Sequence, residues 1–246
     1  MSRPYIIGTG YHSSPDRRAM LEWFWHLWLD NTRRYSNPRE VVILASGNIY
    51  PDWVPDEPET NWIYLSGNLG HCGSLLSGEK PYRFCGCLAG MMTLALYAYC
   101  SEADFIYKEQ DTLAFGPWVE QMYAEIGRHG CIFGSCGNVM PSSQALLLVK
   151  HGFIPDFVRL YLGTGSENTP DNMPECKFAR LEKEHPNLFC RYSFGYDRAR
   201  PFNVNDKVWH AQKFTCEELE LLAAAKLIPA EAVKNMPQTE GAFTNG

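Results

Sequence analysis

The sequence lacks a long apolar run and an excess of basic residues. No apolar run reaches the ~18 residues of a membrane-spanning helix. The N-terminal stretch MSRPYIIGTGYHSS holds too short an apolar segment for a secretory signal. The formal net charge is −6, whereas a nucleic-acid surface needs a basic face. These features predict a cytoplasmic protein with no transmembrane segment and no nucleic-acid partner.

The short motifs of several enzyme and metal-binding classes are also missing. The glycines of GTG (8–10) are not followed by the third glycine of a dinucleotide fingerprint, and neither a P-loop nor a G-x-S-x-G elbow is present. The nine cysteines form no C-x-x-C pair, which argues against a zinc knuckle or a thioredoxin-type motif. Reduced, mostly buried thiols are the favoured interpretation. HCG (71–73) and CGC (85–87) leave a Cys/His zinc site as an alternative.

What the sequence does contain is an alternation of strand and helix patterns. With 45% hydrophobic residues in 246, the chain can bury a full core. Strands are predicted at 5–11, 40–47, 61–67, 103–111 and 131–137, and helices at 13–35, 86–100, 117–127, 142–152 and 215–228. This order predicts an α/β fold with a mostly parallel sheet covered on both faces.

The second half of the chain is less regular. From Gly163 to Trp209 the sequence is irregular, aromatic and charged. A helix then begins with a capping box formed by Thr215 and Glu218. We predict one catalytic domain over residues 1–228 and a loosely ordered tail over 229–246.

The tripeptide EQD (109–111) follows an apolar strand and is the most informative motif. Ligands of open α/β sheets bind beyond the carboxyl ends of the strands. Two acids at i and i+2 would repel each other there and resist burial unless a positive group accompanies them. The motif therefore indicates a hard cation with oxygen ligands, while a solvated loop is the plainer alternative.

This segment resembles the D-x-D segment of GT-A-type nucleotide-sugar glycosyltransferases. The strand, EQD and TLAFG occur in the same order as in that family. The resemblance implies that Asp111 binds Mn²⁺ or Mg²⁺ against the donor diphosphate. Glu109 occupies the first acidic position in place of Asp, and the resemblance implies a contact with a ribose hydroxyl, the metal or a metal-bound water.

The C-terminal half is similar to that of small GT-A enzymes that build surface glycans in bacteria and large DNA viruses. The similar segments are 164–182 and 194–222, and the resemblance spans roughly residues 5–225. It implies a GT-A-like fold with an irregular acceptor-side C-terminal half, in which His210 completes the metal site. It also implies that NLGH (68–71), with Asn68 and His71, contacts the ribose or the donor sugar.

Further donor contacts are expected from basic residues and from the turn after the first strand. The positive charge that a diphosphate needs is scarce in this acidic chain. The residues predicted to supply it are Arg198, Arg200 and Lys213, and those predicted to meet the nucleoside are Thr9, Gly10 and Tyr11.

An inverting transferase also needs a carboxylate base on the acceptor, whereas a retaining one does not. The candidates are Glu167, Glu175 and Asp156.

The predicted function is therefore glycosyl transfer, by a hexosyl- or pentosyltransferase, from a nucleotide-sugar donor to a glycan or other hydroxyl acceptor. The resemblance favours a UDP-sugar donor. Two alternatives stay open: a sugar-nucleotide nucleotidyltransferase, and a non-catalytic carbohydrate-binding protein on a degenerate GT-A fold. Plainer interpretations also stay open for several features. Among them are a packed histidine for His210, a surface salt-bridge cluster for DRARP (197–201), a helix cap for Glu175, and a turn with a surface histidine for NLGH (68–71).

Overall fold

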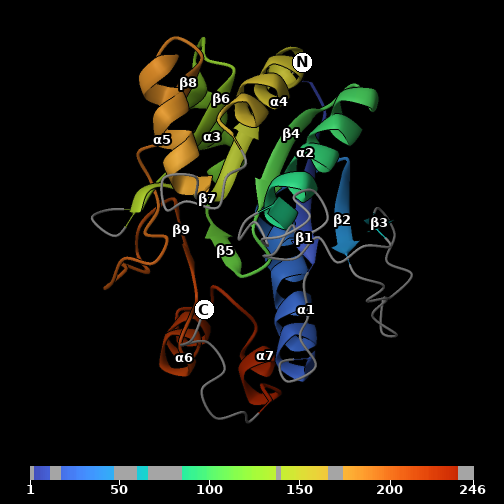
Figure 1. Cartoon of the computed structure of the whole chain (residues 1–246). Coiled ribbons are helices and arrows are strands. Elements are labelled where there is room, and N and C mark those ends of the chain that lie inside the picture. Colours follow the sequence, from blue (N-terminus) through green and yellow to red (C-terminus); the bar gives the residue numbers. More distant parts are fainter. Residues whose placement is uncertain are drawn as a thin grey trace.

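The computed structural model describes residues 3–11, 18–46, 60–65, 85–136, 140–165 and 174–237. In these residues seven strands form one sheet in the order β3-β2-β1-β4-β7-β6-β8 (Figure 1). Its strands are β1 (Tyr5–Tyr11), β2 (Glu40–Ser46), β3 (Thr60–Leu65), β4 (Asp104–Lys108), β6 (Cys131–Cys136), β7 (Met140–Val149) and β8 (Phe189–Arg191). A second sheet pairs β5 (Thr112–Phe115) with β9 (Trp209–Gln212).

The large sheet is mainly parallel, as predicted. β1 pairs in parallel with β2 and β4, β2 with β3, and β6 with β8. β7 lies antiparallel between β4 and β6. The carboxyl ends of β1, β2, β3 and β4 therefore meet at one edge of the sheet, and EQD follows β4 at that edge.

Helices cover both faces of the sheet. The described helices are α1 (Arg18–Tyr35), α2 (Cys85–Cys100), α3 (Trp118–Ile126), the 3₁₀ turn η2 (His151–Phe153), α4 (Ile154–Gly163), α5 (Pro174–Glu184), α6 (Cys216–Ala224) and α7 (Ala230–Lys234). One core joins α1, α3, α6 and the β5–β9 pair to one face. The other core joins α2, α4 and α5 to the opposite face.

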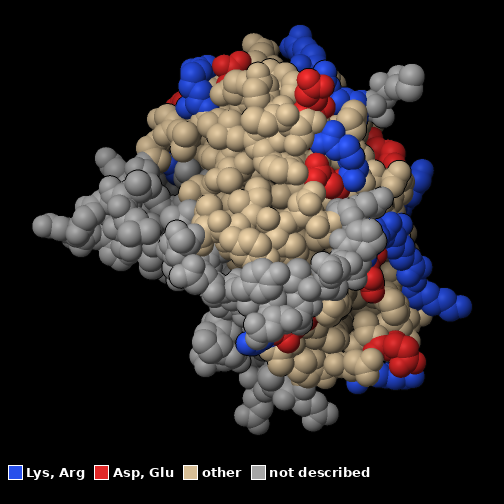
Figure 2. Space-filling model, turned by 90° about the vertical axis from the view of Figure 1, so that its right-hand side faces the viewer, with Lys and Arg blue, Asp and Glu red and all other residues tan. Residues whose placement is uncertain are grey.

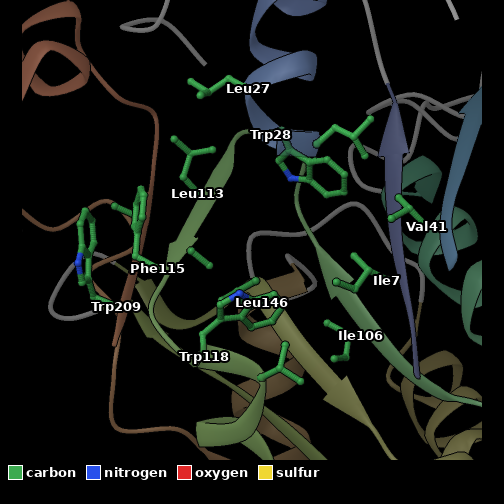
Figure 3. Packing of buried hydrophobic residues seen from close by; sticks show 14 of the residues in the cluster. Ile7, Leu27, Trp28, Val41, Ile106, Leu113, Phe115, Trp118, Leu146 and Trp209 are labelled. Atoms are coloured by element: carbon green, nitrogen blue, oxygen red, sulfur yellow. The ribbon is translucent and has the colours of Figure 1, made fainter. Parts of the chain in front are cut away.

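The first core is rich in large aromatic side chains (Figure 3). Trp28 of α1 and Trp118 of α3 are fully buried. Phe115 of β5 stacks on Trp209 of β9 with ring centroids 4.4 Å apart. Such stacking adds about 0.5–1.5 kcal/mol to the burial of apolar area. The aromatic core therefore fixes the small sheet, and with it the turn at 109–111, against the large sheet.

The prediction of a helix at 142–152 is wrong, because this segment forms β7. Its residues from Ser142 to Val149 are all buried. A continuous apolar run such as ALLLV fits a strand packed on both faces as well as it fits a helix, and periodicity alone does not separate the two. The helix that follows, α4, begins only at Ile154.

The predicted irregular region is more ordered than its composition suggested. It contains α5 and β8, and β9 begins at its end. The capping box is confirmed: the Thr215 side chain accepts from the Glu218 amide, and the Glu218 carboxylate accepts from the Thr215 amide. Of the predicted tail, residues 229–237 include α7, whose Ala232 carbonyl accepts a 2.8 Å hydrogen bond from the Trp23 indole. Residues 238–246 lie outside the described part.

One side of the molecule carries few charges in its middle. Figure 2 views the right-hand side of Figure 1, where the charged residues of both signs that can be seen lie mainly along the top and the right of the described surface. Helix α2 has no charged residue, and its Leu96 and Tyr99 side chains are 45% and 41% exposed. Among the helices of the described ranges, none is long and apolar enough to cross a membrane.

Candidate active site

The turn from β4 to β5 presents the EQD acids at the carboxyl edge of the sheet. The Glu109 amide donates to the Ala145 carbonyl of β7 at 2.9 Å, and the Thr112 amide donates to the Glu109 carbonyl at 3.0 Å. The Trp28 indole donates to that same carbonyl at 2.8 Å. Three elements thus fix the backbone of this turn, which gives its carboxylates defined positions.

Beneath the turn lies a buried lysine. Lys108, the last residue of β4, is fully buried. Its ammonium donates to Asn31 Oδ1 at 2.8 Å and to Thr32 Oγ1 at 2.7 Å, and it lies 4.7 Å from the Trp28 ring centroid. Burial lowers the pKa of Lys108 well below its usual value. These contacts tie α1 to the strand end that carries the acids.

Strand β9 brings a second set of polar residues to the turn. Its register pairs Thr112 with Gln212 at the end of the small sheet. The next pair beyond that end consists of Asp111 and Lys213, which therefore lie side by side. The Lys213 charge lowers the pKa of Asp111 and is the largest of the opposing influences on that carboxyl. The sequence predicted both residues for the site, and the structure brings them together.

Glu109, Asp111 and Glu175 form a cluster of carboxylates with perturbed acidity. Burial raises the pKa of each of the three. The charge of Asp111 raises the pKa of Glu109 further. Glu175 comes from the first turn of α5, so a helix from the predicted irregular region supplies the third acid.

The sequence analysis missed a fourth acid, Asp197. It is only 2% exposed and raises the pKa values of Glu109, Asp111 and Glu175. Its carboxylate accepts a hydrogen bond from the Gln212 side chain, and its carbonyl accepts one from the Gln212 amide at 2.9 Å. The signal available in the sequence is DRARP, whose two arginines predict a diphosphate contact and whose aspartate fits a surface salt bridge.

Two cations, Arg198 and Lys213, act against the acids of the cluster. Arg198 and Lys213 both lower the pKa values of Asp111 and Glu175, and Arg198 also lowers that of Glu109. Four acids face two cations, so the formal charge of the cluster is negative when all six groups are ionised.

The carboxylates are oxygen donors of the kind that a divalent ion takes. Hard oxygen donors suit Mg²⁺ and Mn²⁺, and Mg²⁺ is commonly held by one or two carboxylates together with substrate phosphates. Glu109 and Asp111 supply two carboxylates, and their mutual repulsion would fall in the presence of a bound cation. Within the described ranges, no group of three or more His, Cys, Asp or Glu side chains is placed to hold a metal ion.

His210 lies apart from these two acids. The register places it opposite Ala114, three residues after Asp111 and about 10 Å farther along the strand. It is fully buried, and its Nε2 lies 2.9 Å from the Tyr192 hydroxyl. Burial lowers its pKa to about 4, Lys108 acts in the same direction, and Asp197 opposes them. This environment is that of a packed neutral histidine.

The His210→Gln substitution tests this environment through the pH dependence of the free energy of unfolding. Between pH 6.5 and about 4 the unfolded chain binds a proton that the folded His210 does not. The stability that this residue contributes is therefore complete above pH 6.5 and is lost as the pH falls toward 4, on the order of 3 kcal/mol. We expect the free energy of unfolding from denaturant titrations to fall by that much more in the wild type than in His210→Gln between pH 7 and pH 4. Equal decreases in the two proteins would contradict this assignment.

Comparison with solved structures identifies the fold. The chain superimposes on the galactosyltransferase LgtC, solved with donor and acceptor sugar analogs, with a TM-score of 0.52 and 9% identity, covering 96% of this chain and 98% of that one. For a glycosyltransferase involved in the glycosylation of the major capsid of PBCV-1, the TM-score is 0.50 and the sequence identity is 11%. That superposition covers 89% of this chain and 98% of the other. For apo GlyE of Streptococcus pneumoniae TIGR4, the TM-score is 0.51 and the sequence identity is 11%. That superposition covers 96% of this chain but only 52% of GlyE, so the chain spans about half the length of that protein. The chain has a GT-A glycosyltransferase fold.

Similarity to known proteins is visible in structure and not in sequence. No protein-family model matches the chain. No curated protein sequence matches it either.

Within the GT-A fold, Arg200 lies beside the site but is engaged with the protein itself. Its guanidinium donates to the carbonyls of Asp197 and Gln212, at 3.2 Å and 2.9 Å, and pairs with the Glu218 carboxylate. The sequence predicted a diphosphate contact for this side chain. The structure directs it toward the backbone that carries the site.

The residues at the end of β1 differ in burial. Thr9 is fully buried, and Tyr11 is 4% exposed with its ring against Trp25 and Trp62 at centroid distances of 6.0 Å and 5.9 Å. Gly10 is partly exposed. Of the predicted nucleoside contacts, Gly10 is therefore the one with accessible backbone at this edge.

The remaining predicted site residues are not brought to the cluster by the described structure. Asp156 lies in the first turn of α4, exposed, and pairs with Arg159 of the same helix at 3.0 Å. Val149 ends β7 before this helix and pairs with Phe105 near the amino end of β4. Asp156 therefore lies toward the amino end of β4, whereas Glu109 follows its carboxyl end. The predicted residues Glu167, Asn68 and His71 lie outside the described residues.

Proposed function

We propose that the protein is a glycosyltransferase that moves a hexose or pentose from a UDP-sugar to a hydroxyl of a glycan acceptor. The observation that carries the proposal is the cluster of Glu109, Asp111, Glu175 and Asp197 with Lys213 and Arg198 at the carboxyl edge of β4. This edge is where open α/β sheets bind their ligands. The GT-A fold supports the proposal, since the similar structures are described as glycosyltransferases.

In this proposal Glu109 and Asp111 hold Mn²⁺ or Mg²⁺ through their carboxylate oxygens. The bound ion would supply positive charge against the donor diphosphate. Lys213 and Arg198, whose charges already act on Asp111, would contact the same diphosphate. Transfer of the sugar leaves negative charge on the departing nucleoside diphosphate, and fixed cations at that position stabilise the transition state more than the ground state.

In this proposal Glu175 is the base that takes the proton of the acceptor hydroxyl. Burial raises its pKa, and a carboxylate of raised pKa accepts a proton from an acceptor hydroxyl more readily. Its carbonyl accepts a hydrogen bond from the Ser142 hydroxyl at 2.5 Å, which ties the start of α5 to β7. A cytoplasmic location, expected from the sequence, stays a prediction.

The direct test is a transfer assay. The purified chain is incubated with UDP-, GDP- and dTDP-sugars and CMP-sugars, with Mn²⁺ or Mg²⁺ and an oligosaccharide acceptor mixture, while release of nucleotide is measured. Metal-dependent release of UDP from one sugar class, abolished by EDTA, is expected. The control is Glu184→Gln, which changes an exposed acid at the end of α5 and is expected to keep full activity.

Two other results would contradict the proposal. Release of pyrophosphate from a nucleoside triphosphate would establish a nucleotidyltransferase. Binding of glycan without turnover of any nucleotide sugar would establish a carbohydrate-binding protein.

A further inference from the structure

Arg200 donates hydrogen bonds to four backbone carbonyls, and its side chain is 29% exposed. Its Nη1 donates to the carbonyls of Asp197 and Ala199 at 3.2 Å and 3.0 Å. Its Nη2 donates to the carbonyls of Gln212 and Lys213 at 2.9 Å and 3.3 Å. One guanidinium therefore links two chain segments that each carry a charged residue of the candidate site.

Both segments contain a residue in a left-handed backbone conformation. Asp197 has φ +53° and Lys213 has φ +56°. Residues other than glycine populate this region sparsely, and such conformations persist when surrounding contacts hold them. The carbonyls of these two residues are among those that Arg200 binds.

The guanidinium is itself held in place from three sides. It lies 5.0 Å from the Phe202 ring centroid and 5.9 Å from that of Phe214. Its Nη2 also donates to Glu218 Oε2 at 3.1 Å, and the same oxygen accepts the Thr215 amide at 2.9 Å. The first turn of α6 thus fixes the position of the arginine.

We infer that Arg200 is a positioning residue that holds the backbones of Asp197 and Lys213 in left-handed conformations and so places their charges against Asp111. The inference rests on the proposed function for its effect on donor binding. The hydrogen bonds on which it depends need a planar fork with several donors, which arginine has and lysine lacks. Arg200→Lys keeps the charge and removes the fork.

The first test measures donor affinity by titration calorimetry of UDP with Mn²⁺. Arg200→Lys is expected to weaken binding about tenfold or more, the range found for residues that orient ligand-binding groups. In a Lys213→Ala background the same substitution is expected to have a smaller effect, because two residues that act as a unit are not additive. Unchanged affinity in Arg200→Lys, or fully additive losses, would overturn the inference.

The second test does not depend on donor binding. Amide hydrogen exchange is measured at two backbone amides. The Tyr196 amide donates to the His210 carbonyl at 2.8 Å, and the Gln212 amide donates to the Asp197 carbonyl at 2.9 Å. In Arg200→Lys both amides are expected to exchange at least about tenfold faster, with the amides of β4 unchanged. Unchanged exchange at both amides would overturn the positioning role of Arg200 even if the donor proves to be another nucleotide.

The matched control is Arg191→Lys. Arg191 also pairs with an acid, Glu182, and donates to a carbonyl, that of Pro141 at 2.7 Å. It contacts none of the site residues in the described structure through these bonds, so both readouts are expected to stay at wild-type values. If the wild type binds no nucleotide, the proposed function fails while the exchange result still decides the inference.

Discussion

Asp111→Asn is expected to lower the rate of sugar transfer by at least about 100-fold, the usual effect of removing one preorganised charge-stabilising group. Asn has nearly the shape of Asp but cannot supply an anionic oxygen to a divalent ion. The position is also flanked by Lys213 and Arg198, whose charges act on this carboxyl. Loss of the carboxylate would leave these cations facing the diphosphate without the ion.

The fold is expected to tolerate this substitution. Burial raises the pKa of Asp111, so the folded state disfavours the ionised form, and a neutral side chain at this position does not lose stability for that reason. Steady-state release of nucleoside diphosphate and thermal unfolding are measured together. Glu220→Gln, at an exposed position of α6, is the matched control. A variant that keeps more than a tenth of the wild-type rate would contradict the assignment of Asp111.

Gly195→Ala is expected to lower the free energy of unfolding by about 3–5 kcal/mol. Gly195 has φ +115°, a conformation that side chains rarely adopt. A Cβ at this position would lie 2.1 Å from His210 Nε2. His210 cannot easily move, because it is fully buried, bonded to Tyr192 and part of β9.

A matched glycine gives the control for this prediction. A Cβ at Gly163, the last residue of α4, would meet no atom within 4 Å. Gly163→Ala is therefore expected to change the free energy of unfolding by less than about 1 kcal/mol. Denaturant titrations of both variants measure the difference. Equal stability of the two variants would show that the packing of His210 against Gly195 is not as described.

The regular part of the fold was predictable from local pattern. Strands such as 40–46 and helices such as 118–126 show apolar runs or periodicity bounded by polar and turn residues. β7 was missed because a run buried on both faces carries no period. β5 and β9 are four residues each, too short for a period to show.

The candidate site was predictable only where its residues lie next to each other in the sequence. Glu109 and Asp111 follow one strand and stand out as paired acids. Asp197 joins them through the bridge between residue 197 and Ala211, a long-range pairing that no local pattern records. His210 and Lys213 lie in one short segment, and only the register of β9 against β5 shows that Lys213 is the residue that follows beside Asp111.

The central claim is that Glu109 and Asp111 hold a divalent ion against a nucleoside diphosphate. The most direct measurement is a crystal of the protein grown with UDP and Mn²⁺, with anomalous diffraction recorded near the manganese absorption edge. The account predicts one anomalous peak about 2.0–2.3 Å from carboxylate oxygens of Glu109 or Asp111, with the diphosphate between it and Lys213. A peak at another place, or a nucleotide bound with no manganese at these two carboxylates, would contradict it.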